Sequence, residues 1–196
     1  MNSIIGLTGG IASGKSTASA YIEDRGYPVL DADKFSRKAT AKGGPSYRGI
    51  IEAFGEDILA PDGEIDRQKL GSIIFSDPGR RKVLNGLVHP EIRRMMNEER
   101  DRLLKESHVF LDIPLLFENG LDDQCDITLT VYVDESIQKS RLMERNGLSR
   151  KEAESRIGSQ MPLSEKRDRS DYVLDNSGSR EKLYEQIEQF LTKIEK

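Results

Sequence analysis

Residues 6–17 read GLTGGIASGKST, a stretch that combines glycines with a lysine and hydroxyl side chains. It matches the phosphate-binding pattern GxxxxGK[ST], with Gly9, Gly14, Lys15 and Ser16 at the fixed positions. Glycines let backbone amides turn toward an anion, and a helix that begins near Lys15 adds its positive end. Lys15 can then reach the terminal phosphates of a nucleotide, and Ser16 can ligate Mg²⁺. The stretch therefore predicts a nucleotide-phosphate site; the alternative is a chance glycine turn capped by serine.

Two carboxylates, Asp31 and Asp33, follow the hydrophobic run that ends at Leu30. In open α/β sheets, ligands bind at this carboxyl edge. Residues two apart on an extended segment point the same way, so we expect one or both acids to face the phosphate loop. Either acid could take a proton from an attacking hydroxyl or hold Mg²⁺ through water. The alternative is that either one caps the helix that follows.

A third acid, Asp112, ends the hydrophobic run VFLD, at the place of a Walker B aspartate. There it would order the same Mg²⁺ that Ser16 binds. The segment PLLFE at 114–118 comes directly after it and forms an apolar lip with Glu118. This lip could line a base or an acyl chain, or it could be an ordinary core edge.

Further polar residues fit a kinase site. Arg141 and Arg145 are four positions apart and share a helix face, from which a closing lid could bring positive charge to a migrating phosphoryl group. Asn176 could hydrogen-bond an adenine, although asparagine is also common in turns. His89 precedes a proline, which predicts a helix start, and His108 is assigned a structural role.

Strand-length hydrophobic runs alternate with amphipathic segments, which predicts a parallel sheet wrapped by helices. The predicted strands are Ile4–Thr8, Tyr27–Leu30, His108–Ile113, Ile127–Val133 and Tyr172–Leu174. Residues 34–106 are too long for a simple crossover and predict an inserted helical subdomain. A helix is expected to end at Gly147 and another to be capped by Ser149, forming a mobile flap. The C-terminal segment places Leu183, Ile187, Phe190, Leu191 and Ile194 on one helix face.

Composition limits the class of protein. The chain has 196 residues, mean hydropathy −0.59 and net charge −4, which favour a single soluble domain and argue against a nucleic-acid footprint. No apolar run reaches the length of a membrane span, and no signal peptide is recognisable. The single cysteine, Cys125, has no partner for a disulfide or a zinc site, which favours the cytoplasm.

Taken together, the motifs resemble those of the dephospho-coenzyme A kinase family, in the family's order and approximate spacing. They are LTGGIASGKST, VLDADKFSR, GEIDRQKLGSIIF, VHPEIR, DIPLLFENG, RLMERNGLS, RIGSQM and VLDNSG, while Ser170 stands where the family pattern has alanine. The resemblance implies a P-loop kinase fold, in one domain, that phosphorylates the 3'-hydroxyl of the ribose of dephospho-coenzyme A with ATP and Mg²⁺. It implies a core (about 1–33, 107–140 and 170–196), an acceptor-binding insert (about 34–106) and a lid (about 141–169). It implies no nucleic acid, membrane or obligatory protein partner.

The resemblance also assigns roles to individual residues. It implies Asp33 as the base for the ribose hydroxyl, with Lys15 and Arg141 completing the catalytic set. The implied ATP contacts are Gly9, Gly10, Ala12, Ser13, Gly14, Lys15, Ser16, Thr17, Arg141 and Asn176. The implied acceptor contacts are Asp33, His89, Pro114, Leu115, Leu116, Phe117 and Glu118, and the metal ligands are Ser16 and Asp112.

Two other functions are open to this sequence. Another kinase of the same fold, acting on a nucleoside monophosphate or on shikimate, would not predict the insert with HP and PLLFE. A nucleotide-dependent binding module would be expected to carry an NKxD signature or a partner-binding segment, and the sequence contains neither.

Overall fold

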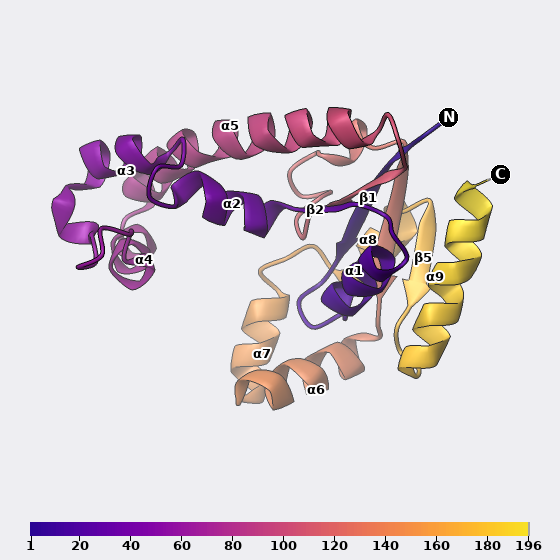
Figure 1. The fold of residues 1–196 in the computed structure, drawn as a ribbon. Helices are drawn as coiled ribbons and strands as arrows, with labels where there is room; N and C mark the ends of the chain where they lie inside the picture. Colours follow the sequence, from indigo (N-terminus) through magenta and orange to yellow (C-terminus); the bar gives the residue numbers. More distant parts are fainter. Residues whose placement is uncertain (196) are drawn as a thin grey trace. The chain divides into compact units, whose positions relative to one another are not determined.

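The computed structural model describes residues 1–195 and divides the chain into two compact units (Figure 1). Unit 1 joins Met1–Val29 to the chain from Leu103 onward, and unit 2 is Leu30–Arg102. The chain passes from unit 1 to unit 2 between Val29 and Leu30, inside a strand. It returns between Arg102 and Leu103, at the end of a long helix.

The strands form one five-stranded sheet with the order β2-β3-β1-β4-β5. Their bounds are β1 Ile4–Gly9, β2 Val29–Asp31, β3 Val109–Asp112, β4 Ile127–Tyr132 and β5 Tyr172–Asp175. β1 pairs in parallel with β3 and β4, and β4 pairs in parallel with β5. The predicted parallel sheet is therefore confirmed, with strand ends that differ from the predicted ones by one or two residues. Because β1 is central, its carboxyl end lies between those of β3 and β4.

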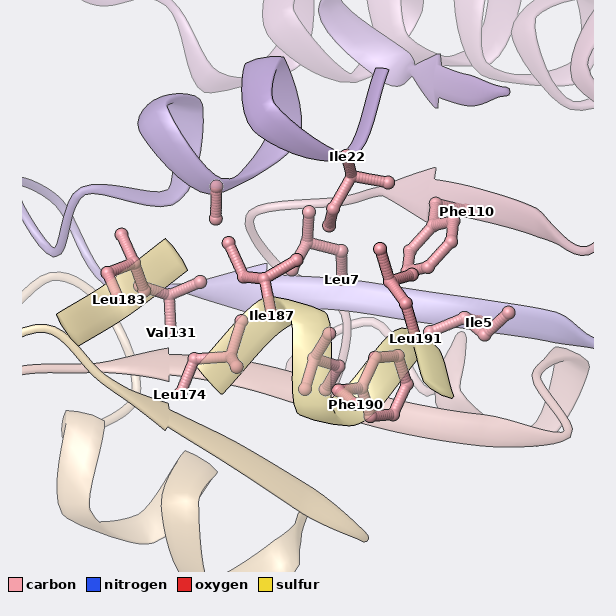
Figure 2. Close-up of a cluster of buried hydrophobic side chains, with 12 residues drawn as sticks. Ile5, Leu7, Ile22, Phe110, Val131, Leu174, Leu183, Ile187, Phe190 and Leu191 are labelled. Carbon is pink, nitrogen blue, oxygen red and sulfur yellow. The ribbon is translucent and has the colours of Figure 1, made fainter. Parts of the chain in front are cut away.

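The core of unit 1 explains why β1 is hydrophobic at alternate positions. Ile5 and Leu7 are fully buried on the face of β1 that packs against α1 (Lys15–Asp24) and α9 (Arg180–Ile194), as Figure 2 shows. The opposite face is also covered, since a Cβ added at Gly6 would lie 2.7 Å from Cys125 Sγ. Burial on both faces is typical of parallel sheets. The other members of the core cluster are Ala18, Ile22, Phe110, Leu129, Val131, Leu174, Leu183, Ile187, Phe190 and Leu191.

Three further helices complete unit 1: α6 Glu135–Asn146, α7 Arg150–Ile157 and α8 Leu163–Arg169, with a short 3-10 turn, η2, at Asp122–Gln124. α6 ends at Gly147, whose φ of 63° is the left-handed conformation that favours glycine. Ser149 and Glu152 form a capping box at the start of α7. The predictions for Gly147 and Ser149 are thus confirmed, whereas α8 was not predicted.

Unit 2 has its own hydrophobic core. Its helices are α2 Ala32–Thr40, α3 Tyr47–Phe54, α4 Arg67–Ser76 and α5 Pro78–Leu103, with a 3-10 turn, η1, at Glu56–Ile58. Ile50, Ile58, Leu70 and Val88 are buried together, and partly buried apolar side chains surround them. This segment therefore folds around a cluster separate from the one under the sheet.

The prediction of a helix start at His89 is wrong, because His89 and Pro90 lie inside the continuous helix α5. A proline within a helix loses one backbone hydrogen bond. Val88 and Ile92, on either side of Pro90, both pack into the core of unit 2. We infer that this packing holds the helix through the proline.

Among residues 1–195, no helix has the length and apolar character needed to cross a membrane.

Candidate active site

The phosphate loop joins β1 to α1 and depends on a glycine at position 14. Gly14 has a φ of 91°, which is unfavourable for any residue with a side chain. A Cβ there would also lie 2.0 Å from Asn176 Nδ2. Both the backbone conformation and the close approach of Asn176 therefore require glycine, as the sequence motif predicts.

Three polar side chains hold the backbone of this loop. Gln138 Nε2 donates to Ile11 O at 2.8 Å, and Ile11 N donates to Gln160 Oε1 at 3.0 Å. Asn176 Nδ2 donates to Ser13 O at 2.8 Å. The loop is thus fixed from α6, from the α7–α8 connection and from the end of β5. Neither glutamine was predicted to hold the loop. Gln138 lies on a charged helix outside the motifs, and Gln160 belongs to the motif RIGSQM but was given no role.

The loop retains unused hydrogen-bonding capacity. Ser13 is fully buried, and within residues 1–195 its Oγ has no hydrogen-bond partner. The first amides of α1 lack an intrahelical acceptor, and Gly14 has no side chain with which to cap them. Amides and a hydroxyl gathered at a helix N-terminus favour a bound phosphate. Ser16 and Thr17 lie in the first turn of α1, next to these amides.

Lys15 and Asp112 are brought together by the register of the sheet. Asp112 lies opposite Leu7 at the end of β3, and its Oδ1 forms an ion pair with Lys15 Nζ. Ser19 Oγ donates to Asp112 Oδ2 at 2.6 Å. The buried carboxylate is therefore engaged by Lys15 and Ser19, and within the described chain it forms no hydrogen bond with Ser16. Its oxygens and the Ser16 hydroxyl are nevertheless hard donors of the kind that Mg²⁺ prefers.

A pocket of about 360 Å³ opens beside the loop. Arg141 lines it and donates from Nη2 to Asn176 O at 3.0 Å. Arg145, on the same helix, is exposed, pairs with Asn146 Oδ1 and does not line the pocket. The structure therefore brings only one of the two predicted arginines to this site. Gly178 and Arg180 were not predicted; the lining residues are Ala12, Gly14, Thr17, Arg141, Asn176, Gly178 and Arg180.

The two acids at the end of β2 and the start of α2 have different environments within unit 2. Asp31 is the N-cap of α2 and accepts from Asp33 N at 2.8 Å and Lys34 N at 3.3 Å. Because this cap starts the helix at Ala32, the expectation that both acids lie on an extended segment is wrong. Asp33 is exposed in the first turn of α2, and its carboxylate makes no hydrogen bond or ion pair within the described chain. Asp31 thus has the capping role, and Asp33 is left available.

The segment 114–118 divides into exposed and buried parts. Leu115 is exposed, whereas Leu116 and Phe117 are buried in unit 1. Their burial fits a core edge better than a pocket wall. Glu118 Oε1 pairs with Lys166 Nζ at 2.9 Å. His89 is exposed on α5 in unit 2.

Comparison with known sequences identifies relatives over nearly the whole chain. The sequence profile of the dephospho-CoA kinase family (CoaE) matches residues 3–182. A protein named dephospho-CoA kinase from Geobacillus kaustophilus is 51% identical over 189 residues, which cover 95% of this chain and 94% of that protein. One of the same name from Oceanobacillus iheyensis is 50% identical over 195 residues, covering 98% of each chain.

Comparison with solved structures also identifies similar chains over nearly the whole length of this one. The crystal structure of TT1252 from Thermus thermophilus has a TM-score of 0.81 and 41% identity, and the match covers 98% of this chain and 97% of that one. Dephospho-CoA kinase from Campylobacter jejuni has a TM-score of 0.77 and 28% identity, with 97% and 96% covered. Shikimate kinase from Bacteroides thetaiotaomicron, at 16% identity and a TM-score of 0.52 over 98% of both chains, shares the fold alone. The predicted P-loop kinase fold is confirmed.

Proposed function

The chain belongs to the dephospho-CoA kinase family, and on this premise we propose which of its residues carry out the family's reaction. The protein transfers the γ-phosphoryl group of ATP to the 3'-hydroxyl of the ribose of dephospho-CoA, giving CoA and ADP. The observation that carries the proposal is the phosphate loop with its buried, unpartnered Ser13 hydroxyl beside a pocket lined by Arg141 and Asn176. Neither a shikimate-type kinase nor a binding module is favoured.

On the donor side, the amides at 12–17 would bind the ATP phosphates, and Gly9 and Gly10 would allow the loop to approach them. Lys15 would stabilise the negative charge that shifts during transfer, and Arg141 would add a second positive charge. The Asn176 side chain stabilises the loop by donating to Ser13 O, and the Asn176 backbone carbonyl accepts a hydrogen bond from Arg141. Ser16 and Asp112 would hold Mg²⁺, which neutralises phosphate charge when bound.

On the acceptor side, Asp33 would remove the proton of the 3'-hydroxyl. Its exposure and freedom from partners in unit 2 support this role, since a base must reach a proton on the substrate. Pro114, Leu115, Glu118 and His89 would contribute to the acceptor site. We propose that residues 34–106 form the acceptor-binding part of the enzyme and that residues 141–169 form a lid.

The same proposal makes the protein a cytoplasmic enzyme of small-molecule metabolism, without a nucleic-acid, membrane or obligatory protein partner. The single cysteine and the net charge of −4 are in keeping with it.

The test is an acceptor panel. ADP release is measured by a coupled assay with dephospho-CoA, AMP, shikimate or no acceptor, at equal concentrations and with MgATP in excess. We expect turnover with dephospho-CoA and only background with the others. Turnover with AMP or shikimate that equals or exceeds it would reject the proposed acceptor.

A further inference from the structure

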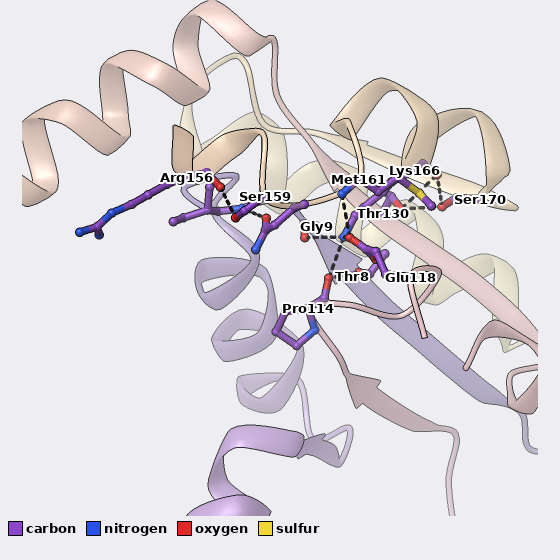
Figure 3. A network of polar contacts seen from close by, with 12 residues as sticks. Thr8, Gly9, Pro114, Glu118, Thr130, Arg156, Ser159, Met161, Lys166 and Ser170 are labelled. Atoms are coloured by element: carbon purple, nitrogen blue, oxygen red, sulfur yellow. Dashed lines mark hydrogen bonds and ion pairs between the residues drawn. The ribbon is translucent and has the colours of Figure 1, made fainter. Parts of the chain in front are cut away.

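Lys166 is a fully buried lysine at the centre of a polar network behind the phosphate loop (Figure 3). It lies on α8, and its Nζ donates to Pro114 O at 2.7 Å and to Gly9 O at 3.4 Å. Its third partner is Glu118 Oε1 at 2.9 Å. A lysine ammonium has three N–H donors, so the three oxygens match its full capacity.

These oxygens belong to segments that are far apart in the sequence. Gly9 is the last residue of β1 and the first glycine of the phosphate loop, and Pro114 follows β3 on the proposed acceptor side. Glu118 Oε1 also accepts from Met161 N at 3.1 Å, in the connection between α7 and α8. The neighbouring Gln160 holds Ile11 of the phosphate loop. Lys166 therefore links the loop, the segment 114–118 and the base of the proposed lid.

Stability alone does not explain a buried lysine here. Removing two charges from water costs several kcal/mol, and well-packed apolar residues often replace a buried ion pair without loss of stability. A methionine would fill much the same space but could not donate to Gly9 O and Pro114 O. Thr8 Oγ1 also donates to Pro114 O, at 3.1 Å, but among these two donors only Lys166 reaches both Pro114 O and Gly9 O.

We propose that Lys166 is a positioning residue for phosphoryl transfer, which keeps the start of the phosphate loop in register with the segment 114–118. The proposal rests on the function proposed above. It assigns to Lys166 no contact with either substrate, and it predicts an effect on kcat because misplacement of reacting groups by about 1 Å can cost on the order of 100-fold in rate.

The experiment compares Lys166→Met, Glu118→Gln and the double variant with the wild type, with kcat, both KM values and the melting temperature as readouts. Lys166→Met leaves Glu118 buried without its counter-charge, so we expect both kcat and the melting temperature to fall. The double variant removes both charges, so its melting temperature should exceed that of either single variant and recover toward that of the wild type. Its kcat should stay on the order of 100-fold below wild type, with much smaller changes in KM, because Gly9 O loses the Lys166 donor and Pro114 O keeps only the Thr8 hydroxyl.

Two controls separate the alternatives. Glu118→Gln alone keeps Lys166 and measures what Glu118 itself contributes. Ser170→Ala removes the 2.8 Å bond from Ser170 Oγ to the Lys166 carbonyl without touching Nζ, and should retain most of the activity. If kcat of the double variant recovers together with its melting temperature, or equals that of Glu118→Gln, Lys166 has no positioning role. The acceptor specificity of the wild type, measured in the same assay, tests the proposed function separately.

Discussion

Lys15 at the start of α1 and Asp112 at the end of β3 form a largely buried ion pair, with side-chain exposures of 16% and 5%. The pair places the lysine of the phosphate loop against the acid that the Walker B position predicts. It has two consequences for a substitution of Lys15, one for catalysis and one for stability.

Lys15→Ala should lower kcat by on the order of 100-fold or more, the range for loss of a preorganised electrostatic group. It should also lower the melting temperature, because Asp112 would remain buried with only Ser19 as a partner. Steady-state kinetics and thermal unfolding measure the two effects. Near-normal turnover would remove the loop lysine from the mechanism.

Asp33→Asn should leave the melting temperature nearly unchanged, because the Asp33 carboxylate has no partner within unit 2. As the proposed base, it should nevertheless lose about 100- to 10,000-fold in turnover while ATP binding persists.

Asp31→Ala is the matched control two residues away. It removes the cap of α2, at a cost of about 1 kcal/mol in stability, and should retain most of the turnover. If Asp31→Ala loses more activity than Asp33→Asn, the base has been assigned to the wrong carboxylate.

Much of the fold could be predicted from local pattern. The strand of VFLD and the helix face of Leu183, Ile187 and Leu191 are hydrophobic because both pack into one core, so their spacing carries the information. Gly147, in the left-handed conformation, ends α6, and Ser149 caps the start of α7, both as predicted. At Pro90 the local pattern failed, since packing by Val88 and Ile92 keeps α5 continuous.

The phosphate loop could be predicted because its motif is contiguous. Of the groups that hold it, only Asn176 was predicted to lie at this site. Gln138, Gln160 and Lys166 lie more than 120 residues after the loop in the sequence, on segments whose charge suggests solvent. Apart from the Glu118 carboxylate beside Lys166, their partners are backbone carbonyls and amides, which leave no mark in the sequence. Asp31 shows the same limit, since the roles of two acids two positions apart cannot be told apart until the helix start is known.

Asn176→Ala should raise the KM for ATP by about tenfold, the equivalent of one lost hydrogen bond of roughly 1.4 kcal/mol. The Asn176 side chain donates to Ser13 O and lies against Gly14. Without it, the phosphate loop would lose a contact that supports the ATP-binding side of the site. The KM for dephospho-CoA should change little. Asn146→Ala, at an exposed asparagine outside the pocket, is the control. Equal changes in both KM values would contradict a role confined to ATP.

Asp171 predicts a pH dependence of stability. The Thr128 hydroxyl and, secondly, the Thr128 amide donate to its carboxylate and lower the pKa of Asp171 below its usual value. A lowered pKa in the folded state stabilises the protein above the unfolded pKa of about 4, and this contribution is lost as the pH falls through the folded pKa. Asp171→Asn should therefore melt at a lower temperature than wild type at pH 7. The difference between the melting temperatures of Asp171→Asn and wild type should narrow below about pH 4. A gap that is constant down to pH 3 would show that the charge of Asp171 does not contribute.

CoA is the sharpest test of the 3'-hydroxyl of dephospho-CoA as the acceptor, because CoA differs only in carrying a phosphate at that position. The measurement is the initial rate of ADP formation with each compound at equal concentration, together with the mass and elution of the product. We predict turnover with dephospho-CoA to a product identical to CoA, and no ADP above background when CoA is supplied. Comparable ADP release with both compounds would contradict the assignment of the acceptor hydroxyl.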